Sequence, residues 1–207
     1  MLTDLQKRLH AIKDGEISVE RAYGDGERRN RRFEDSPSGA RFYCTICARW
    51  YRRFKPFGLR GRQNARCPGC GSLERHRFLW LYLNEMTHAL RHVRDILHVA
   101  PESCIQNALL RKPGIRYLGI DRYDDDANAT QQDLTDLTYE ADGFDLLICN
   151  HVLEHIPRDR AALSEIHRVL RPGGRALIMV PIDRNRQETF EDPQIVSPSA
   201  RHEAFGH

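Results

Sequence analysis

Four cysteines form two pairs with the spacing of a metal site. Cys44 and Cys47 make the first Cys-x-x-Cys, and Cys67 and Cys70 make the second, nineteen residues further on. Each such turn directs two sulfurs at one ion, and two turns complete the tetrahedron that zinc prefers. Four thiolates leave no open position, so the spacing predicts a structural zinc ribbon. Four unrelated thiols and a redox dithiol are the alternatives.

The predicted ribbon combines arginines with aromatic side chains. Arginines for phosphates and aromatic rings for base stacking are what single-stranded RNA binding requires. The alternative is that the rings form the small core of the ribbon while the arginines keep it soluble. The residues concerned are Arg41, Arg49, Arg52, Arg53, Arg60, Arg62 and Arg66, with Phe42, Tyr43, Trp50, Tyr51 and Phe54.

Charge is divided unevenly along the 207 residues. Residues 28–66 hold twelve Lys or Arg against two acidic residues, a net of +10, so the remainder must carry −7 to give the overall +3. A basic module beside a mildly acidic body suggests an acidic or phosphorylated partner. A solvated arm explains the same charges without a partner.

Polar side chains also follow a series of apolar segments in the second half of the chain. Asp121 ends "IRYLGID", Asp133 follows "ATQQ", and Asn150 ends "FDLLICN". Earlier, "DILHVAPE" passes from a strand into a helix at a turn that contains no glycine. Ligands of open α/β sheets bind at the carboxyl ends of strands, where all these groups would meet.

The elements that must position these groups alternate between strand and helix. Alternation of this kind predicts a doubly wound, mostly parallel α/β sheet with helices on both faces. The predicted strands are 95–100, 115–121, 129–137 (a short strand or a loop), 144–150 and 175–182, and the predicted helices are 102–111 and 159–170.

The composition of the chain predicts a division into three parts. Residues 1–40 are predicted to form an amphipathic helix and a flexible linker, and residues 41–72 the ribbon. Residues 73–207 would be the α/β core, with Ser72 capping a helix that runs to about residue 90. No apolar run approaches the roughly 20 residues of a membrane span, and no signal peptide is visible, so a cytoplasmic location is expected.

The stretch "GFDLLICNHVLEHIPRDRAALSEIHRVLRPGGRALIMVPI" resembles the class I S-adenosylmethionine-dependent methyltransferases, especially the broad type-11 group. The resemblance covers about residues 95–182. It implies a Rossmann-like core and S-adenosylmethionine as cofactor. The family closes its sheet with two further strands, for which the polar tail after residue 182 provides no pattern. We therefore expect a core that is incomplete at its C-terminal end.

The resemblance also assigns roles to individual residues. Asp121, with Arg122 beside it, would hold the ribose hydroxyls, and Asp133 the adenine amino group. Leu134 would line the adenine pocket. Asn150 and His151 would lie near the methionine end of the cofactor.

The family's glycine-rich first turn is replaced here by "HVAPE". His98 takes the acidic position, while Ala100, Glu102 and Cys104 take the three glycine positions. Pro101 suits the first turn of a helix. Glu102 places a carboxylate where a cationic sulfonium or ammonium could be bound, and where a dinucleotide pyrophosphate would be disfavoured. Its alternative role is to cap the helix. We predict that His98, Ala100, Pro101 and Glu102 contact the cofactor.

Methyl transfer needs a base only when the acceptor must lose a proton. His151, Glu154 and His155 are the candidates, although Glu154 and His155 are common in the family's turn and could serve only to hold it together. The expected acceptor is a small molecule or a saccharide. RNA bound by the ribbon, or a non-catalytic binding module, are the alternatives.

Overall fold

The computed structural model describes residues 39, 41–58, 61–87, 89–123, 129–183, 185–188 and 190–205. The helix and linker predicted for residues 1–40 therefore lie outside the described residues, apart from Gly39. The chain divides into two compact units between Ala89 and Leu90, whereas the sequence placed a boundary after residue 72. None of the helices in the described ranges is both long and apolar enough to cross a bilayer.

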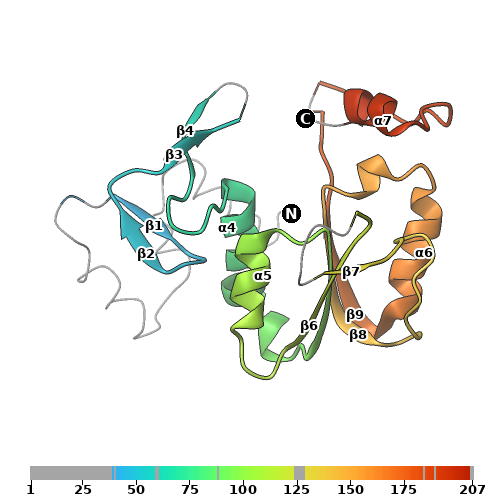
Figure 1. The fold of residues 1–207 in the computed structure, drawn as a ribbon, viewed down its shortest axis with the longest axis horizontal. Coiled ribbons are helices and arrows are strands. Elements are labelled where there is room, and N and C mark those ends of the chain that lie inside the picture. Colours follow the sequence, from blue (N-terminus) through green and yellow to red (C-terminus); the bar gives the residue numbers. More distant parts are fainter. Residues whose placement is uncertain are drawn as a thin grey trace, which may run out of the picture. The chain divides into compact units, whose positions relative to one another are not determined.

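The first unit holds two small antiparallel hairpins and a helix (Figure 1). Short strands joined by tight turns suit this segment, because it has few aliphatic residues and must bring the cysteine pairs together. The elements are β1 (Phe42–Cys44) paired with β2 (Arg49–Tyr51), β3 (Lys55–Phe57) paired with β4 (Arg62–Arg66), helix α4 (Glu74–Leu81) and the π-helical turn η1 (Tyr82–Met86).

Helix α4 packs with the cysteine module. The Arg77 guanidinium donates to the carbonyls of Ser72 (2.6 Å) and Ala65 (3.1 Å) and lies over the Phe54 ring. The predicted cap is wrong: Leu73 is the N-cap residue, and its backbone N–H donates to His76 Nδ1 at 3.2 Å. Ser72 Oγ instead lies 3.2 Å from the Cys70 sulfur, because the chain is still turning around the cysteines at this position.

The second unit is a five-stranded parallel sheet in the order β7-β6-β5-β8-β9. This confirms the predicted doubly wound fold, and Figure 1 shows α5 and α6 on opposite sides of the sheet. The elements are η2 (Ala89–Arg91), β5 (Asp95–Val99), α5 (Ser103–Leu110), β6 (Arg116–Asp121), β7 (Ala129–Gln131), β8 (Phe144–Asn150), η3 (Leu153–His155), α6 (Asp159–Val169), β9 (Leu170–Met179) and α7 (Pro198–Phe205).

Apolar residues explain why this sheet forms. Every residue of β5 is buried, as are the last five of β8, which is typical of central parallel strands covered on both faces. The register sets Val99 opposite both Ile120 and Cys149. The residues that follow Val99, Ile120 and Cys149 therefore lie close together at the edge formed by the carboxyl ends of the strands. Strand order reverses between β5 and β8, and this switch point is where such sheets bind ligands.

The last strand begins earlier than predicted. "RPGG" was expected to stop the helix before a strand that begins at residue 175. Helix α6 does end at Val169, but β9 already starts at Leu170 and includes these residues, with a register shift between Phe144 and Leu146 on its partner. Gly174 allows the close approach, since a Cβ there would stand 2.8 Å from the Arg171 carbonyl oxygen. After β9, the described residues contain helix α7 and no further strand.

Candidate functional site

The four cysteines of the first unit converge on one point. Their sulfurs all lie within 4.8 Å of one another, and two of the separations are 3.5 Å (Cys44 to Cys70) and 3.8 Å (Cys47 to Cys67). A tetrahedral zinc with Zn–S bonds of about 2.3 Å separates its sulfurs by about 3.8 Å. The donor set and its spacing therefore fit one zinc ion.

Without a metal ion, the thiols of this cluster differ in pKa. The contact between the Cys44 and Cys70 sulfurs, 3.5 Å apart, lowers the pKa of Cys44 to about 4 and raises the pKa of Cys70. Burial, with the neighbouring sulfurs, raises the pKa of Cys47. Several thiolates can share this position only beside a cation, which is the condition that a structural metal satisfies.

The aromatic rings of this unit contact one another. Phe54 lies 5.5 Å from Phe42 and 5.8 Å from Tyr51 between ring centroids, and Tyr43 lies 5.1 Å from Trp50. These rings build the small core of the module, as one of the two sequence interpretations predicts. The Arg77 guanidinium adds a cation–π contact to this ring cluster, with its Cζ 4.6 Å from the Phe54 ring centroid.

A cavity of about 700 Å³ lies at the carboxyl ends of the strands in the second unit. Segments after β5, β6, β7 and β8 contribute to it, and so does the C-terminal helix. It is lined by Val99, Ala100, Ile120, Asp121, Arg122, Tyr123, Gln132, Asp133, Leu134, Thr135, His151, Val152, His155, Ile156, Pro157, Arg158, Val196, Pro198 and His202.

The structure divides the predicted cofactor residues into two groups. The first group lines the cavity and consists of Ala100, Asp121, Arg122, Asp133, Leu134 and His151. The second group lies beside it, at the turn after β5 and the end of β8, and consists of His98, Pro101, Glu102 and Asn150. Of the catalytic candidates, His151 and His155 line the cavity, and Glu154 is buried beneath it.

Two residues at the edge of the cavity have left-handed backbone conformations without being glycine. Ala100 has φ = 46° and His151 has φ = 55°. Their backbone N–H groups donate to the carbonyls of Ile120 and Met179, both at 2.8 Å, which holds the turns in place. Conformations of this kind are costly for residues with a Cβ and collect at functional sites. Both follow directly on central strands, at the switch point.

A chain of polar contacts explains how the glycine-free turn is held. His98, fully buried in β5, contacts the Glu102 carboxylate through Nε2 (3.1 Å) and the Tyr117 hydroxyl through Nδ1 (3.1 Å). Asn150 Nδ2 donates to the same carboxylate at 3.3 Å. Glu102 is the N-cap residue of α5 by position, but its side chain makes no capping hydrogen bond. It connects β5 with β8 instead.

Asn150 presents one atom that the surrounding protein does not satisfy. Its Oδ1 is buried and accepts no hydrogen bond from the described residues. A buried acceptor of this kind costs about 1–3 kcal/mol unless a ligand or water pairs with it. A donor group in the cavity, beside the Glu102 carboxylate, would pair with it.

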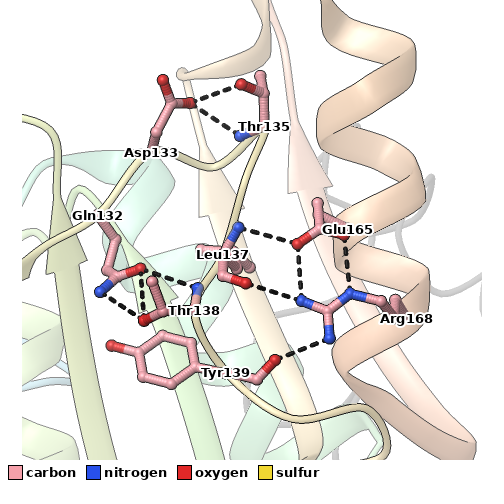
Figure 2. Close-up of polar contacts among 8 residues, drawn as sticks. All are labelled: Gln132, Asp133, Thr135, Leu137, Thr138, Tyr139, Glu165 and Arg168. Atoms are coloured by element: carbon pink, nitrogen blue, oxygen red, sulfur yellow. Dashed lines mark hydrogen bonds and ion pairs between the residues drawn. The ribbon is translucent and has the colours of Figure 1, made fainter.

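Asp133 is fixed by the loop that follows β7. Its Oδ1 accepts from the Thr135 backbone N–H (2.9 Å) and from the Thr135 hydroxyl (2.8 Å), and these bonds lower the pKa of Asp133 (Figure 2). The same loop is held by a pair on α6: Glu165 accepts from the Leu137 N–H, and Arg168 donates to the Leu137 carbonyl (Figure 2). The Asp133 carboxylate is therefore ionised and held in one place.

The side chains of His151 and Glu154 lie in contact beside the cavity. His151 Nδ1 lies 3.5 Å from Glu154 Oε1, and the Glu154 side chain is 4% exposed. Neither Glu154 oxygen accepts a hydrogen bond within the described part of the chain. Cys149, the neighbouring thiol, is unsuited to nucleophilic chemistry, since burial and the charges of Glu154 and Glu102 raise its pKa to about 12.

Several residues at this site were not foreseen from the sequence. Tyr117 supports His98, and its place on β6, opposite β5, could have suggested this contact. Val196, Pro198 and His202 come from the polar tail, in which no periodic pattern indicated a role.

An open parallel α/β sheet with a cavity at its switch point defines the doubly wound class of ligand-binding domains. Within this class, a family model described as "Methyltransferase domain" matches residues 97–178. The match covers less than half of the chain and agrees with the resemblance to the class I S-adenosylmethionine-dependent methyltransferases that the sequence indicated. No curated protein sequence matches the chain.

Two solved structures illustrate the likeness. The chain is similar to the PH0226 protein from Pyrococcus horikoshii OT3, at 19% identity and a TM-score of 0.44, over 54% of this chain and 61% of that one. It is also similar to phosphoethanolamine N-methyltransferase 2 of Haemonchus contortus, solved with S-adenosyl-L-methionine, at 19% identity and a TM-score of 0.44. That match covers 66% of this chain and 34% of the enzyme. The chain thus spans less than two thirds of either protein.

Proposed function

We propose that the second unit binds S-adenosylmethionine and catalyses transfer of its methyl group to a small molecule or a saccharide. The observation that supports this most strongly is the set of groups at the switch point. Two carboxylates line the cavity at Asp121 and Asp133, and Glu102 with the unpaired Asn150 Oδ1 lies beside it. The family's cofactor carries an ammonium and a sulfonium, which such acceptors suit.

Each group then has a separate role. Asp121, at the end of β6 and with Arg122 beside it, holds the ribose hydroxyls. Asp133 accepts from the adenine amino group, and Leu134, 4% exposed, covers the adenine ring.

The methionine end is bound by Glu102, Asn150 and His151. Asn150 Oδ1 would accept a hydrogen bond from the ammonium, and the Glu102 carboxylate would pair with its charge. Ala100 and Pro101 keep the turn small enough for close approach, and His98 holds the Glu102 carboxylate in position.

When bound, the cofactor supplies an electrophilic methyl group on a positively charged sulfur. The chain's contribution is to align the acceptor and to exclude water from the cavity. A hydroxyl or amine acceptor must also lose a proton, and His151 is the group placed to take it. The buried Glu154 carboxylate, 3.5 Å away, stabilises the imidazolium that results. His155 lines the same wall and is the second candidate.

The size of the cavity favours a small acceptor. About 700 Å³ lies within the range of roughly 300–1,000 Å³ that is typical of small-molecule sites. A cofactor and a modest acceptor fit such a volume together.

Calorimetry on the purified chain tests the proposal. We expect one molecule of S-adenosylmethionine or S-adenosylhomocysteine to bind per chain. Absence of heat with either ligand, for protein shown to be folded by circular dichroism, would favour the non-catalytic binding module.

We further propose that Cys44, Cys47, Cys67 and Cys70 hold one structural zinc. Protein purified without added metal should contain one zinc per chain by elemental analysis, and Cys67→Ser should lose it. Cys104→Ser, at a cysteine of the second unit, is the matched control and should keep it. Unchanged zinc in Cys67→Ser would contradict the assignment.

RNA as acceptor is the second candidate, and one observation favours it. Lys55, Phe57, Arg62 and Arg66 of the β3–β4 hairpin are all exposed. A basic hairpin with an exposed ring can contact phosphates and bases. RNA binding that weakens steeply with salt, and that is lost in Arg62→Ala/Arg66→Ala, would support this candidate. Binding that salt does not affect would count against it.

A further inference from the structure

The C-terminal segment forms part of the cavity wall in the second unit. Val196, Pro198 and His202 line the cavity together with residues that follow β6, β7 and β8. Val196 is nevertheless 59% exposed. An apolar side chain that faces a cavity and remains open to solvent gains burial when a ligand enters.

Specific contacts hold this segment in place. Arg201 Nε donates to the Glu154 carbonyl at 2.9 Å, and Arg201 Nη1 donates to the Ile195 carbonyl at 3.1 Å. One guanidinium thus connects helix α7 both to the turn after β8 and to its own leading segment.

Ring contacts and a cap support the same arrangement. The imidazoles of His155 and His202 are stacked, with centroids 6.1 Å apart and planes 22° apart. Ser197 Oγ accepts from the Ala200 N–H at 3.2 Å, at the start of α7. The segment is therefore a folded element docked on η3.

We infer that residues 195–205 are the outer wall of the cofactor site, and that Val196 and His202 contact the bound ligand. The inference rests on the proposed function, because it places the ligand between these residues and the ends of β6 and β7. Nothing in the family's glycine-rich turn or acidic positions assigns a role to this segment.

The position of the wall sets its physical effect. Asp121 and Asp133 line the cavity from the ends of β6 and β7, whereas His155 and the docked His202 line it from η3 and α7. Val196 and His202 contact the bound ligand in this inference, so they stabilise the bound state. Their loss should therefore raise the dissociation rate more than it changes the association rate.

Binding kinetics with S-adenosylhomocysteine test the inference. We would compare the parent with a chain that ends at Gln194 and with Arg201→Ala, which removes the hydrogen bonds to the Glu154 and Ile195 carbonyls and leaves the His155–His202 stack. Glu203→Ala, an exposed position on the same helix, is the matched control. The shortened chain should release the ligand about tenfold faster, with association changed by less than about threefold. Arg201→Ala should show an intermediate effect, and Glu203→Ala none.

The outcomes separate the two claims. If the parent binds the ligand, and both the shortened chain and Arg201→Ala release it at the parent's rate, the inference is overturned and the proposed function is left intact. A parent that binds no ligand would overturn the proposed function and this inference with it.

Hydrogen exchange provides a readout that does not depend on affinity. In the free parent, amides of residues 198–205 should exchange more slowly than in Arg201→Ala, and ligand should protect them further. If the shortened chain fails to fold, this measurement on Arg201→Ala and the parent decides the matter: equal exchange, with and without ligand, would overturn the inference.

Discussion

The two ends of the parallel sheet are built on opposite principles. At the amino ends of the strands, charged groups are paired. Arg116 donates to both Asp95 oxygens, at 2.5 and 2.7 Å, and Arg171 reaches Asp95 (2.8 Å) and Asp145 (2.6 Å). The Asp145 carboxylate also accepts from the backbone N–H groups of Arg94 and Asp95.

At the carboxyl ends, the same strands finish in strained and incompletely paired groups. Ala100 and His151 have positive φ, and Asn150 Oδ1 is buried without a partner among the described residues. Costs of this kind persist where the surrounding fold supplies the stability and a ligand completes the site. The comparison teaches that one end of the sheet holds the strands together, and the other is arranged for a ligand.

The largest expected effect is at the carboxyl ends. Asp121→Ala should weaken binding of S-adenosylmethionine by about 1.5–3 kcal/mol, as for other hydrogen bonds to charged groups. Asp121→Asn should lose less. The free energy of unfolding should change by less than about 0.5 kcal/mol, because the residue lies at the cavity rather than in the core.

Calorimetry and urea denaturation on the same protein measure the two quantities. If both Asp121 variants are folded and bind like the parent, the carboxylate is a turn residue, whose bond to the Tyr123 N–H (3.0 Å) is its whole role.

At the amino ends the pattern of effects should reverse. Asp95→Ala should reduce the free energy of unfolding by about 1–2 kcal/mol. This loss is toward the low end of what hydrogen bonds to charged groups contribute, because the arginine partners are partly exposed. Cofactor affinity should be unchanged. A variant as stable as the parent would show that the network contributes nothing.

Acid sensitivity sharpens this prediction. Arg116 lowers the pKa of Asp95, and for Asp145 the Asp95 N–H and Arg171 lower the pKa against the opposing effect of burial. A carboxyl pKa that is lower in the folded protein stabilises it above the unfolded pKa of about 4, and this stability is lost as pH falls further.

The difference in unfolding free energy between parent and Asp95→Ala should therefore be constant above about pH 5 and shrink below about pH 4. Urea titrations across this range measure it. A difference that persists at low pH would assign the effect to packing instead of charge.

The smallest expected effect concerns backbone strain. Ala100→Gly removes a left-handed alanine, a gain of about 1 kcal/mol that the greater freedom of glycine in the unfolded chain largely offsets. Its unfolding free energy should equal or slightly exceed that of the parent. Ala161→Gly, at an ordinary position in α6, should lose about 1 kcal/mol. Equal losses in the two variants would mean that Ala100 is unstrained.

The sequence predicted most of the fold because its signals are local. Buried runs such as "FDLLICN" and the stop after "ESCIQNALLR" need no tertiary information, and the paired cysteines identify the metal-site candidate by spacing alone. The start of β9 was mistaken because "RPGG" usually ends a helix, whereas here Gly174 allows an extended chain to pass close to the Arg171 carbonyl.

The site was harder to predict where it depends on contacts between distant segments. The chain from Tyr117 through His98 to Glu102 is set by strand register, which the sequence does not specify. The role of the tail depends on one guanidinium, that of Arg201, and on a stacked His155–His202 pair. Neither leaves a periodic or compositional signal.

The central claim is that the glycine-free turn after β5 binds a cationic cofactor through Glu102. Calorimetry of Glu102→Gln with S-adenosylmethionine and with adenosine, which lacks both cationic groups, tests this most directly. We predict that S-adenosylmethionine binds about tenfold more weakly, or about 1.4 kcal/mol, while adenosine binds as to the parent. Equal losses for both ligands would indicate distortion of the His98–Glu102–Asn150 contacts. No loss for either ligand would contradict the account and leave Glu102 as a structural link between β5 and β8.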